Sequence, residues 1–420
     1  MLLADGVDED TSVFDSARDL LPRVKGAFCL TFTDGHTMYA ARDPHGVRPL
    51  VLGRLAKGWV VASETCALDI CGAQFIREIE PGELVAIDEA GIRSVNFAPA
   101  KRHGCVFEYV YLARPDSDIK GRSVNASRVD IGRRLAREYP AEGADLVIPV
   151  PESGNPAAVG YARESGITFA HGLVKNAYVG RTFIQPTQTL RQLGIRLKLN
   201  PLREVINGKK LVVVDDSIVR GNTQHALIRM LREAGAAEVH VRIASPPVKW
   251  PCFYGIDFAS PGELIANASP SDDPETVCAT ICDTIGADSL GFVSVEEMVA
   301  ATEQPRSELC TACFSGKYPV ALPEPVARAQ GILQARPGGG PLAHGDALAA
   351  ADGPVQGVGL AAAGPVDPAI VDVPHRHARR PQLLFSTVHS VGATSSEHNV
   401  LTGSHPPSYF AADITATAKY

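Results

Sequence analysis

The sequence predicts a two-part protein, with a β-rich N-terminal segment followed by an α/β segment built on a parallel sheet. The first observation is a series of short runs rich in Val, Ile, Thr, Phe and Tyr between about Gly26 and Phe97, separated by Asp-Gly, Lys-Gly and Pro-Gly turns. The second is the alternation of apolar strands with helices from about Gly104 to Pro319. The third is the loss of periodicity after Pro323.

The individual elements follow from these patterns. One helical stretch, at about residues 11–25, precedes the first strand. In the α/β segment we expect strands at DLVIPVP, KKLVVVDDS and EVHVRIASPP, and helices at AAVGYARES and NTQHALIRMLREAG. Such repeats form a parallel sheet with both faces covered, and ligands bind beyond the carboxyl ends of its strands. The Gly/Ala/Pro-rich segment 323–420 lacks the apolar periodicity of a packed core, so we expect a disordered tail.

Composition excludes several classes of function. The 420 residues carry 40 Lys and Arg against 47 Asp and Glu, so the net charge is −7. This mildly acidic balance argues against nucleic-acid and polybasic membrane binding. We find no secretory signal and no apolar run long enough to span a membrane, and nine cysteines do not suggest a disulfide framework. We therefore expect a cytoplasmic protein.

The segment from Lys210 to Thr223 carries the strongest chemical signal. A central apolar strand ends in Asp215 and Asp216, and a short turn with Gly221 then opens a helix. Backbone N–H groups at such a turn and helix start bind a phosphate, whereas two acids suit sugar hydroxyls or Mg²⁺. The motif G-x-x-x-x-G-K-[ST] does not occur, which excludes a P-loop site. The segment predicts a site for a phosphorylated sugar.

VVVDDSIVRGNT resembles the signature of type I phosphoribosyltransferases, which bind phosphoribosyl pyrophosphate (PRPP). Its SIVRG form is similar to that of the amidophosphoribosyltransferase family. Nine further stretches resemble this family in order along about residues 2–318: GAFCLTFTDG, RDPHGVRPLVLG, ASETCALD, EIEPGELVAI, CVFEYVYLARPDSDIKG, PVPESGNPAAVGYA, KNAYVGRTFIQPTQ, PPVKWPCFYGIDF and CTACFSGKYP. The resemblance implies the second half of an N-terminal-nucleophile β-sandwich glutaminase domain at 1–102, a type I phosphoribosyltransferase domain at 103–322, and a tail at 323–420.

The resemblance also implies roles for individual residues. Asp215 and Asp216 would hold the ribose hydroxyls and Mg²⁺. The 5′-phosphate cradle would comprise Ser217, Ile218, Val219, Arg220, Gly221, Asn222 and Thr223. A second strand-end loop would contact pyrophosphate through Glu152, Ser153, Gly154 and Asn155, with Ser153 also a Mg²⁺ ligand. A basic loop at 175–192 would close over PRPP, with Lys175, Tyr178 and Arg181 at the substrate.

Four cysteines stand in contexts that resemble iron–sulfur ligands of the family. Cys310 and Cys313 form a C-x-x-C pair, and Cys105 and Cys252 complete the set. From the residues alone, a zinc ion, an iron–sulfur cluster or no metal are all open. The resemblance implies a 4Fe–4S cluster, which would be structural or oxygen-sensing because the reaction moves no electrons.

The family's reaction replaces the pyrophosphate of PRPP with ammonia from glutamine and opens purine biosynthesis. Its glutaminase uses an N-terminal cysteine, whereas this sequence begins Met-Leu-Leu-Ala-Asp. We therefore expect ammonia-dependent activity without glutamine hydrolysis. An incomplete copy and a genuinely shortened protein both stay open as explanations, as do a non-catalytic PRPP-binding regulator, an inactive fragment and a base-salvaging phosphoribosyltransferase. The resemblance further implies a homo-oligomer that purine nucleotides inhibit.

Overall fold

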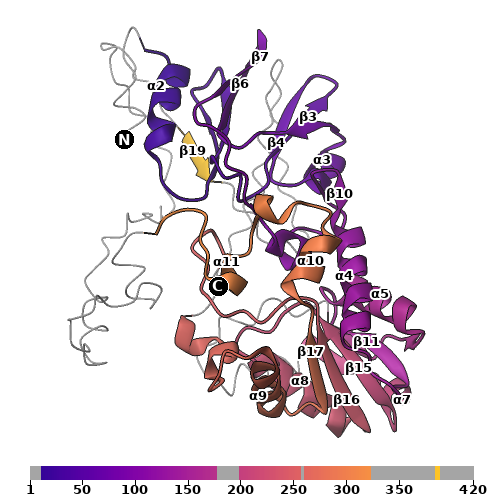
Figure 1. Cartoon of the computed structure of the whole chain (residues 1–420). Coiled ribbons are helices and arrows are strands. Elements are labelled where there is room, and N and C mark those ends of the chain that lie inside the picture. The colour runs from indigo at the N-terminus through magenta and orange to yellow at the C-terminus, as the bar shows by residue number, and fades with distance from the viewer. Residues whose placement is uncertain (1–10, 177–197, 257–259, 323–383, 388–420) are drawn as a thin grey trace, which may run out of the picture. The chain divides into compact units, whose positions relative to one another are not determined.

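The computed structural model describes residues 11–176, 198–256 and 260–322 and the backbone of 384–387 (Figure 1). By its internal contacts the chain divides into two units, residues 1–320 with 383–420 and residues 321–382. All helices and strands below belong to the first unit. None of the helices in these described ranges is long and apolar enough to cross a membrane.

The N-terminal segment contains two antiparallel sheets and two helices. The helix α2 (Val13–Leu20) begins at Ser12, whose hydroxyl accepts a hydrogen bond from the Asp15 backbone N–H at 3.1 Å. One sheet has the order β19-β1-β2-β6-β7 and the other β4-β3-β5, with α3 (Thr65–Cys71) after β4. The strands are β1 (Cys29–Thr33), β2 (Met38–Arg42), β3 (Val51–Leu55), β4 (Gly58–Ala62), β5 (Gln74–Glu78), β6 (Glu83–Asp88), β7 (Gly91–Asn96) and β19 (Leu384–Thr387).

Strand β2 shows how these layers stack. Its side chains alternate, so that Tyr39 and Ala41 pack with Val13 and Ala17 of α2, whereas Met38 and Ala40 enter a core shared with the second sheet. That second core joins Cys29 of β1 and Leu52 of β3, among others. The predicted β-sandwich arrangement is therefore present.

Strand β19 differs from the sequence expectation. The segment 323–420 was expected to lack regular structure, yet Leu384–Thr387 pairs antiparallel with β1. An outer strand such as β1 has unpaired N–H and C=O groups, and a short β-prone segment from a distant part of the chain satisfies them. The rest of the expected tail after residue 322 lies outside the described residues.

The second sheet system is parallel, as the strand–helix alternation predicts. Its order is β12-β11-β15-β16-β17, and all four pairings are parallel. The strands are β11 (Leu146–Pro149), β12 (Thr168–Phe169), β15 (Lys210–Asp215), β16 (Glu238–Ile243) and β17 (Ser289–Phe292), and the helices are α4 (Val124–Glu138), α5 (Asn155–Ser165), α8 (Asn222–Glu233), α9 (Pro274–Ile285) and α10 (Val295–Ala301).

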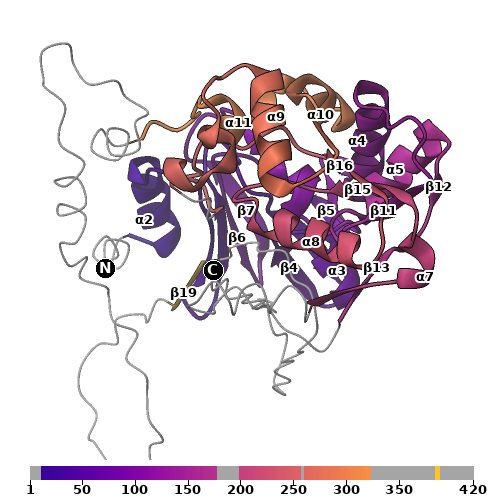
Figure 2. The ribbon, with the colours of Figure 1, turned by 90° about the horizontal axis from the view of Figure 1, so that it is seen from below.

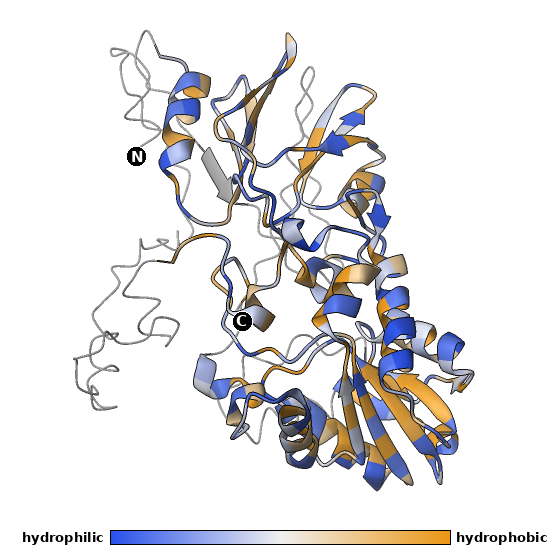
Figure 3. Ribbon diagram, in the orientation of Figure 1, coloured by the Kyte–Doolittle hydropathy of each residue, from blue (hydrophilic) through white to orange (hydrophobic). Residues whose placement is uncertain are grey.

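Helices cover both faces of this sheet (Figures 1 and 2). Val212 and Val214 of β15 pack with residues of α4 and α5, whereas Leu211 and Val213 pack with α8 and α9. Because both faces are buried, the strand is a continuous apolar run rather than an alternating one, as its colour in Figure 3 shows. This explains why KLVVVD was so clear in the sequence.

Shorter elements complete the described fold. They are η1 (Leu21–Arg23), β8 (Gly104–Cys105), η2 (Glu108–Leu112), β9 (Asp118–Ile119), β10 (Arg122–Ser123), β13 (Leu173–Lys175), β14 (Leu199–Pro201), α7 (Arg203–Ile206), η3 (Pro261–Glu263), η4 (Ile265–Ala268), η5 (Arg306–Glu308), β18 (Leu309–Cys310) and α11 (Ala312–Ser315).

Two glycines let α4 and α5 pack backbone to backbone. A Cβ atom on Gly132 would overlap the carbonyl group of Ala157, and one on Gly160 would overlap the carbonyl of Val129. Because α5 follows directly on the loop 151–155, this crossing fixes where that loop lies at the sheet edge.

We therefore predict that Gly132→Ala lowers the free energy of unfolding by roughly 2 kcal/mol, since neither backbone can move aside without losing packing. Urea denaturation measures this. Gly262→Ala is the matched control, because no atom lies within 4 Å of the position of its added Cβ. Equal stability of both variants would contradict the close packing of α4 and α5.

Candidate functional site

Two neighbouring carboxylates lie at the carboxyl end of the central strand β15. Asp215 and Asp216 are each 7% exposed. The Asp215 carboxylate accepts hydrogen bonds at both oxygens, from the Asp216 backbone N–H at 2.9 Å and from the side-chain amide of Gln224. Asp216 accepts one from the Ser217 hydroxyl at 2.9 Å. The strand end thus holds two acids close together in a largely dry environment.

This environment opposes their negative charge. Burial, and then the charge of Asp216, raise the pKa of Asp215 well above its ordinary value. Burial also raises the pKa of Asp216, although hydrogen bonds from Ser217 and Ser153 act in the opposite direction. Buried like charges are stabilised by a cation or by hydroxyl donors, so the pair suits Mg²⁺ and a sugar.

The loop 151–155 approaches the same place from the neighbouring strand. The Val150 N–H donates to the Val214 carbonyl at 2.9 Å, and Gly154 lies so close to that carbonyl that a Cβ atom would overlap it. Ser153 hydrogen-bonds to Asp216. The two strand-end segments expected to bind separate parts of one ligand are therefore in contact.

Lys175 also reaches this loop. It is the last residue of β13, and its ammonium lies 3.0 Å from the carboxylate of Glu152. Both side chains are substantially exposed, so this ion pair contributes little to stability. It does place a cation beside the predicted pyrophosphate loop. Tyr178 and Arg181, the other predicted residues of the basic loop, lie outside the described residues.

The turn between β15 and α8 has the conformation that an anion-binding turn requires. Gly221 precedes the helix with φ of +77°, a conformation that residues with a side chain rarely adopt. Gly221 has no side chain that could cap α8, so no N-cap side chain accepts a hydrogen bond from the first N–H groups of this helix. Asn222 and Thr223, the first two residues of α8, are exposed, as an anion-binding helix start requires.

The other residues of the predicted cradle are placed differently from one another. The Ile218 side chain is buried in the core beneath the turn, so only its backbone suits a ligand. The Val219 carbonyl accepts a hydrogen bond from the Ile265 N–H at 2.9 Å, and Arg220 pairs with Glu263. These contacts anchor the turn to the segment 260–268.

Two side-chain amide oxygens at this edge of the sheet are buried and accept no hydrogen bond from any described residue. They belong to Asn155, at the start of α5, and Gln224, in the first turn of α8. Asn155 was predicted from its loop. Gln224 was missed because the resemblance ended at Thr223; its signal was its position in the first turn of a helix that follows a phosphate-binding turn.

The four predicted cluster cysteines gather in one place. Cys105 of β8 lies opposite Cys310 of the parallel strand β18, and Cys252 and Cys310 share an apolar cluster with Cys105 and Val47. Cys105 and Cys252 also pack against a second apolar cluster, which contains Cys313 of α11. Burial raises the pKa of all four thiols, and the other three cysteines raise that of Cys313 further.

This gathering is not a preformed site for a single ion. Within the described ranges, no group of three or more His, Cys, Asp or Glu side chains is arranged to hold a metal ion. A four-iron core spreads its thiolate ligands more widely than one ion does, so the donor set is compatible with a cluster. All nine cysteines are free thiols.

A buried ion pair lies between the N-terminal segment and the parallel-sheet segment. Arg48 contacts Glu108 of η2 at 3.1 Å, and Glu108 is only 2% exposed. Arg128 of α4 holds η2 in place by donating to the carbonyls of Tyr109 at 2.9 Å and Ala113 at 2.7 Å. Electrostatic interactions couple Arg48 to Cys105 and Cys252 as well.

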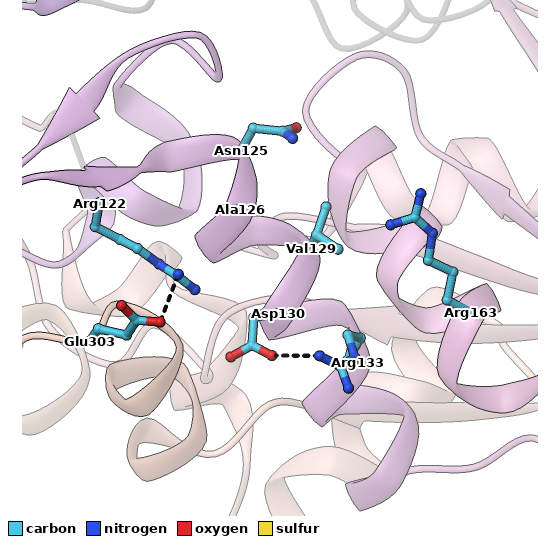
Figure 4. Close-up of a pocket in the computed structure, with 8 residues that line it drawn as sticks. All are labelled: Arg122, Asn125, Ala126, Val129, Asp130, Arg133, Arg163 and Glu303. Atoms are coloured by element: carbon cyan, nitrogen blue, oxygen red, sulfur yellow. Dashed lines mark ion pairs between the residues drawn. The ribbon is translucent and has the colours of Figure 1, made fainter.

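A separate surface hollow of about 480 Å³ lies beside α4 and α5 (Figure 4). Arg122 pairs with Glu303 at 2.7 Å and Arg133 approaches Asp130 at 3.6 Å. Two of its three arginines are thus already paired with acids, and none of the strand-end residues lines it. We do not assign this hollow to the site of Asp215 and Asp216.

Comparison with known proteins agrees with this geometry. A phosphoribosyl transferase domain model matches residues 124–245, and a glutamine amidotransferase domain model matches residues 7–69. The amidophosphoribosyltransferase of Mycobacterium tuberculosis is 69% identical over 333 residues, which are 79% of this chain and 62% of that relative. The one from Methanothermobacter thermautotrophicus is 44% identical over 77% of this chain and 67% of its own length.

A solved structure is similar as well. It is a glutamine phosphoribosylpyrophosphate amidotransferase from Bacillus subtilis complexed with ADP and GMP. Its TM-score is 0.69 at 45% identity, with 76% of this chain and 69% of that chain covered. The chain therefore spans somewhat more than three fifths of the length of the relatives that it resembles.

The buried carboxyl of Glu108 predicts a specific pH dependence of stability. Burial raises its pKa from 4.5 to about 7, although Arg48 opposes this. Between these two values the folded state binds more protons than the unfolded state, so the free energy of unfolding falls as pH rises. Glu108→Gln removes this contribution.

Between pH 4.5 and 7.5 the free energy of unfolding of the wild-type chain should therefore fall by up to about 3 kcal/mol more than that of Glu108→Gln. Urea denaturation of both proteins across this range measures the shift. Parallel pH profiles would show that Glu108 does not titrate in this range.

Proposed function

The chain belongs to the amidophosphoribosyltransferase family, and from this premise we propose that it transfers the phosphoribosyl group of PRPP to ammonia. The products are 5-phosphoribosylamine and pyrophosphate, in the first step of purine biosynthesis. The observation that carries this proposal is the meeting of Asp215 and Asp216 with Ser153 and the glycine turn at one sheet edge.

The residues at this edge divide the substrate between them. We assign the ribose hydroxyls to Asp215 and Asp216 and the 5′-phosphate to the backbone N–H groups at the start of α8. Pyrophosphate then lies against Ser153, Gly154 and Asn155, next to Lys175. With the ribose and the pyrophosphate both held, the bond between C1 and the leaving group has a fixed orientation for attack by ammonia.

The chemical step exchanges one bond for another. The bond from C1 to the pyrophosphate oxygen breaks, the nitrogen of ammonia bonds to C1, and that nitrogen loses one proton. Lys175 balances the charge of the departing pyrophosphate when it exchanges Glu152 for the substrate. The lid roles of Tyr178 and Arg181 are part of the same proposal.

Mg²⁺ fits this site because the donors are oxygens. Asp215, Asp216 and Ser153 would hold it, and it would neutralise pyrophosphate charge when bound. The contact of Ser153 with Asp216 and the raised pKa values of the two buried aspartates support this assignment.

We also propose a 4Fe–4S cluster on Cys105, Cys252, Cys310 and Cys313. The support is the convergence of these four thiols from separate parts of the chain. The positive charge of Arg48 also opposes the burial that raises the pKa of Cys105 and Cys252, which favours their thiolates. A cluster there would join β8, β18 and α11 and would stabilise the fold rather than take part in transfer.

Three further properties belong to the proposal by family membership. Purine nucleotides would inhibit the enzyme, supported by the relative that was solved with ADP and GMP. Glutamine would be the source of the ammonia, supported by the match of residues 7–69 to a glutamine amidotransferase domain. A homo-oligomer and a cytoplasmic location complete it, the latter supported by nine free cysteines.

Asp216→Asn should lower kcat/KM for PRPP about 10- to 100-fold, because the variant lacks the negative charge with which Asp216 would bind Mg²⁺ or a ribose hydroxyl. The assay follows pyrophosphate release from PRPP with Mg²⁺ and ammonium. Asp145→Asn is the control, since Asp145 lies at the opposite end of the strands, where its carboxylate accepts from the Lys210 N–H at 2.8 Å. Binding of PRPP without turnover by the wild-type chain would instead indicate a non-catalytic protein.

Anaerobically prepared chain should contain about four iron and four sulfide per molecule. Cys313→Ser should lose most of both and unfold at lower temperature, whereas Cys71→Ser should keep them, because Cys71 is exposed and distant in sequence from the four cysteines. Iron and sulfide analysis measures this. Iron-free wild-type chain, or equal iron in both variants, would refute the cluster.

A further inference from the structure

Gln224 has an unusual position for a polar side chain. It is the third residue of α8, directly after the exposed residues Asn222 and Thr223, yet it is only 3% exposed. Its side chain points from the helix start toward the end of β15, where it meets Asp215. It therefore lies between the proposed phosphate-binding turn and the proposed ribose-binding acids.

The nitrogen end of this side chain immobilises Asp215. The Gln224 amide donates to one carboxylate oxygen, while the Asp216 backbone N–H donates to the other at 2.9 Å. With both oxygens engaged by the protein, the Asp215 carboxylate has a fixed orientation. Asp216 accepts from the hydroxyls of Ser217 and Ser153, which rotate easily.

The oxygen end of the same side chain remains available. It is buried and accepts no hydrogen bond from the described residues. A buried acceptor without a donor is a free-energy cost to the folded chain, because it has lost its hydrogen bonds to water. Such a cost is offset if a bound molecule supplies the donor, and the molecule that belongs at this strand end on the proposed function is a phosphorylated ribose.

We propose that Gln224 is a specificity-determining residue for the ribose of PRPP. Its N–H group fixes Asp215, and its carbonyl oxygen accepts a hydrogen bond from one ribose hydroxyl, so that a sugar without this hydroxyl leaves the oxygen unpaired. This inference rests on the proposed function and adds to it a residue outside the recognised signature.

The test uses calorimetric titrations of the full chain with ribose 5-phosphate and with its 2-deoxy and 3-deoxy forms, all without Mg²⁺. Without the metal, a metal-bound water is excluded as the donor. The wild-type chain should bind at least one deoxy sugar about tenfold more weakly than ribose 5-phosphate. Gln224→Met, which has similar size but neither polar group, should lose this discrimination.

Gln224→Glu serves as a second variant, because it keeps an acceptor oxygen and loses the N–H donor. It should retain the discrimination between sugars while raising KM for PRPP, since Asp215 is no longer held. His225→Ala is the matched control, as His225 is the next residue of α8 and is exposed. Thermal unfolding of every variant verifies that α8 is intact.

Wild-type discrimination retained by folded Gln224→Met would overturn the inference and leave the proposed function standing. An effect of Gln224→Met on Mg²⁺-dependent PRPP binding alone would also overturn it, because the donor would then be a water on the metal. A wild-type chain that binds neither PRPP with Mg²⁺ nor ribose 5-phosphate would refute the proposed function itself, and this inference with it.

Discussion

The structure depends on keeping two carboxylates side by side at the end of a buried apolar strand. Burial raises the pKa of both Asp215 and Asp216 there, and the charge of Asp216 raises that of Asp215 further. The protein limits this cost with donors from four directions: a backbone N–H, the Gln224 amide and the hydroxyls of Ser217 and Ser153. Such an arrangement is unfavourable for stability alone. It is reasonable for a site whose ligand brings a cation and hydroxyl groups.

Close backbone packing brings the second half of the site to these acids. Gly132 and Gly160 let α4 and α5 approach until their backbones touch, and Gly154 brings the loop 151–155 against the Val214 carbonyl. Arg128 and the Arg48–Glu108 pair extend the same region toward the cysteines and the N-terminal segment. The positions of helices, loop and carboxylates are therefore set together by packed backbone.

Much of this was predictable from sequence, for physical reasons. β15 is buried on both faces, so its apolar run was unmistakable, and the acids and glycine turn after it carried their chemistry in adjacent residues. Contacts between residues distant in sequence were not predictable: the Lys175–Glu152 pair, the Arg48–Glu108 pair and the pairing of β19 with β1. Gln224 was missed because a glutamine in a helix is ordinarily exposed, and only the fold shows that it is buried.

The most direct test of the account is calorimetric titration of the folded chain with PRPP in the presence of Mg²⁺. The account predicts saturable binding of one PRPP per chain, weakened when Mg²⁺ is removed. Absence of binding heat at several temperatures, with the chain shown to be folded by circular dichroism, would contradict a sugar-diphosphate site at this sheet edge.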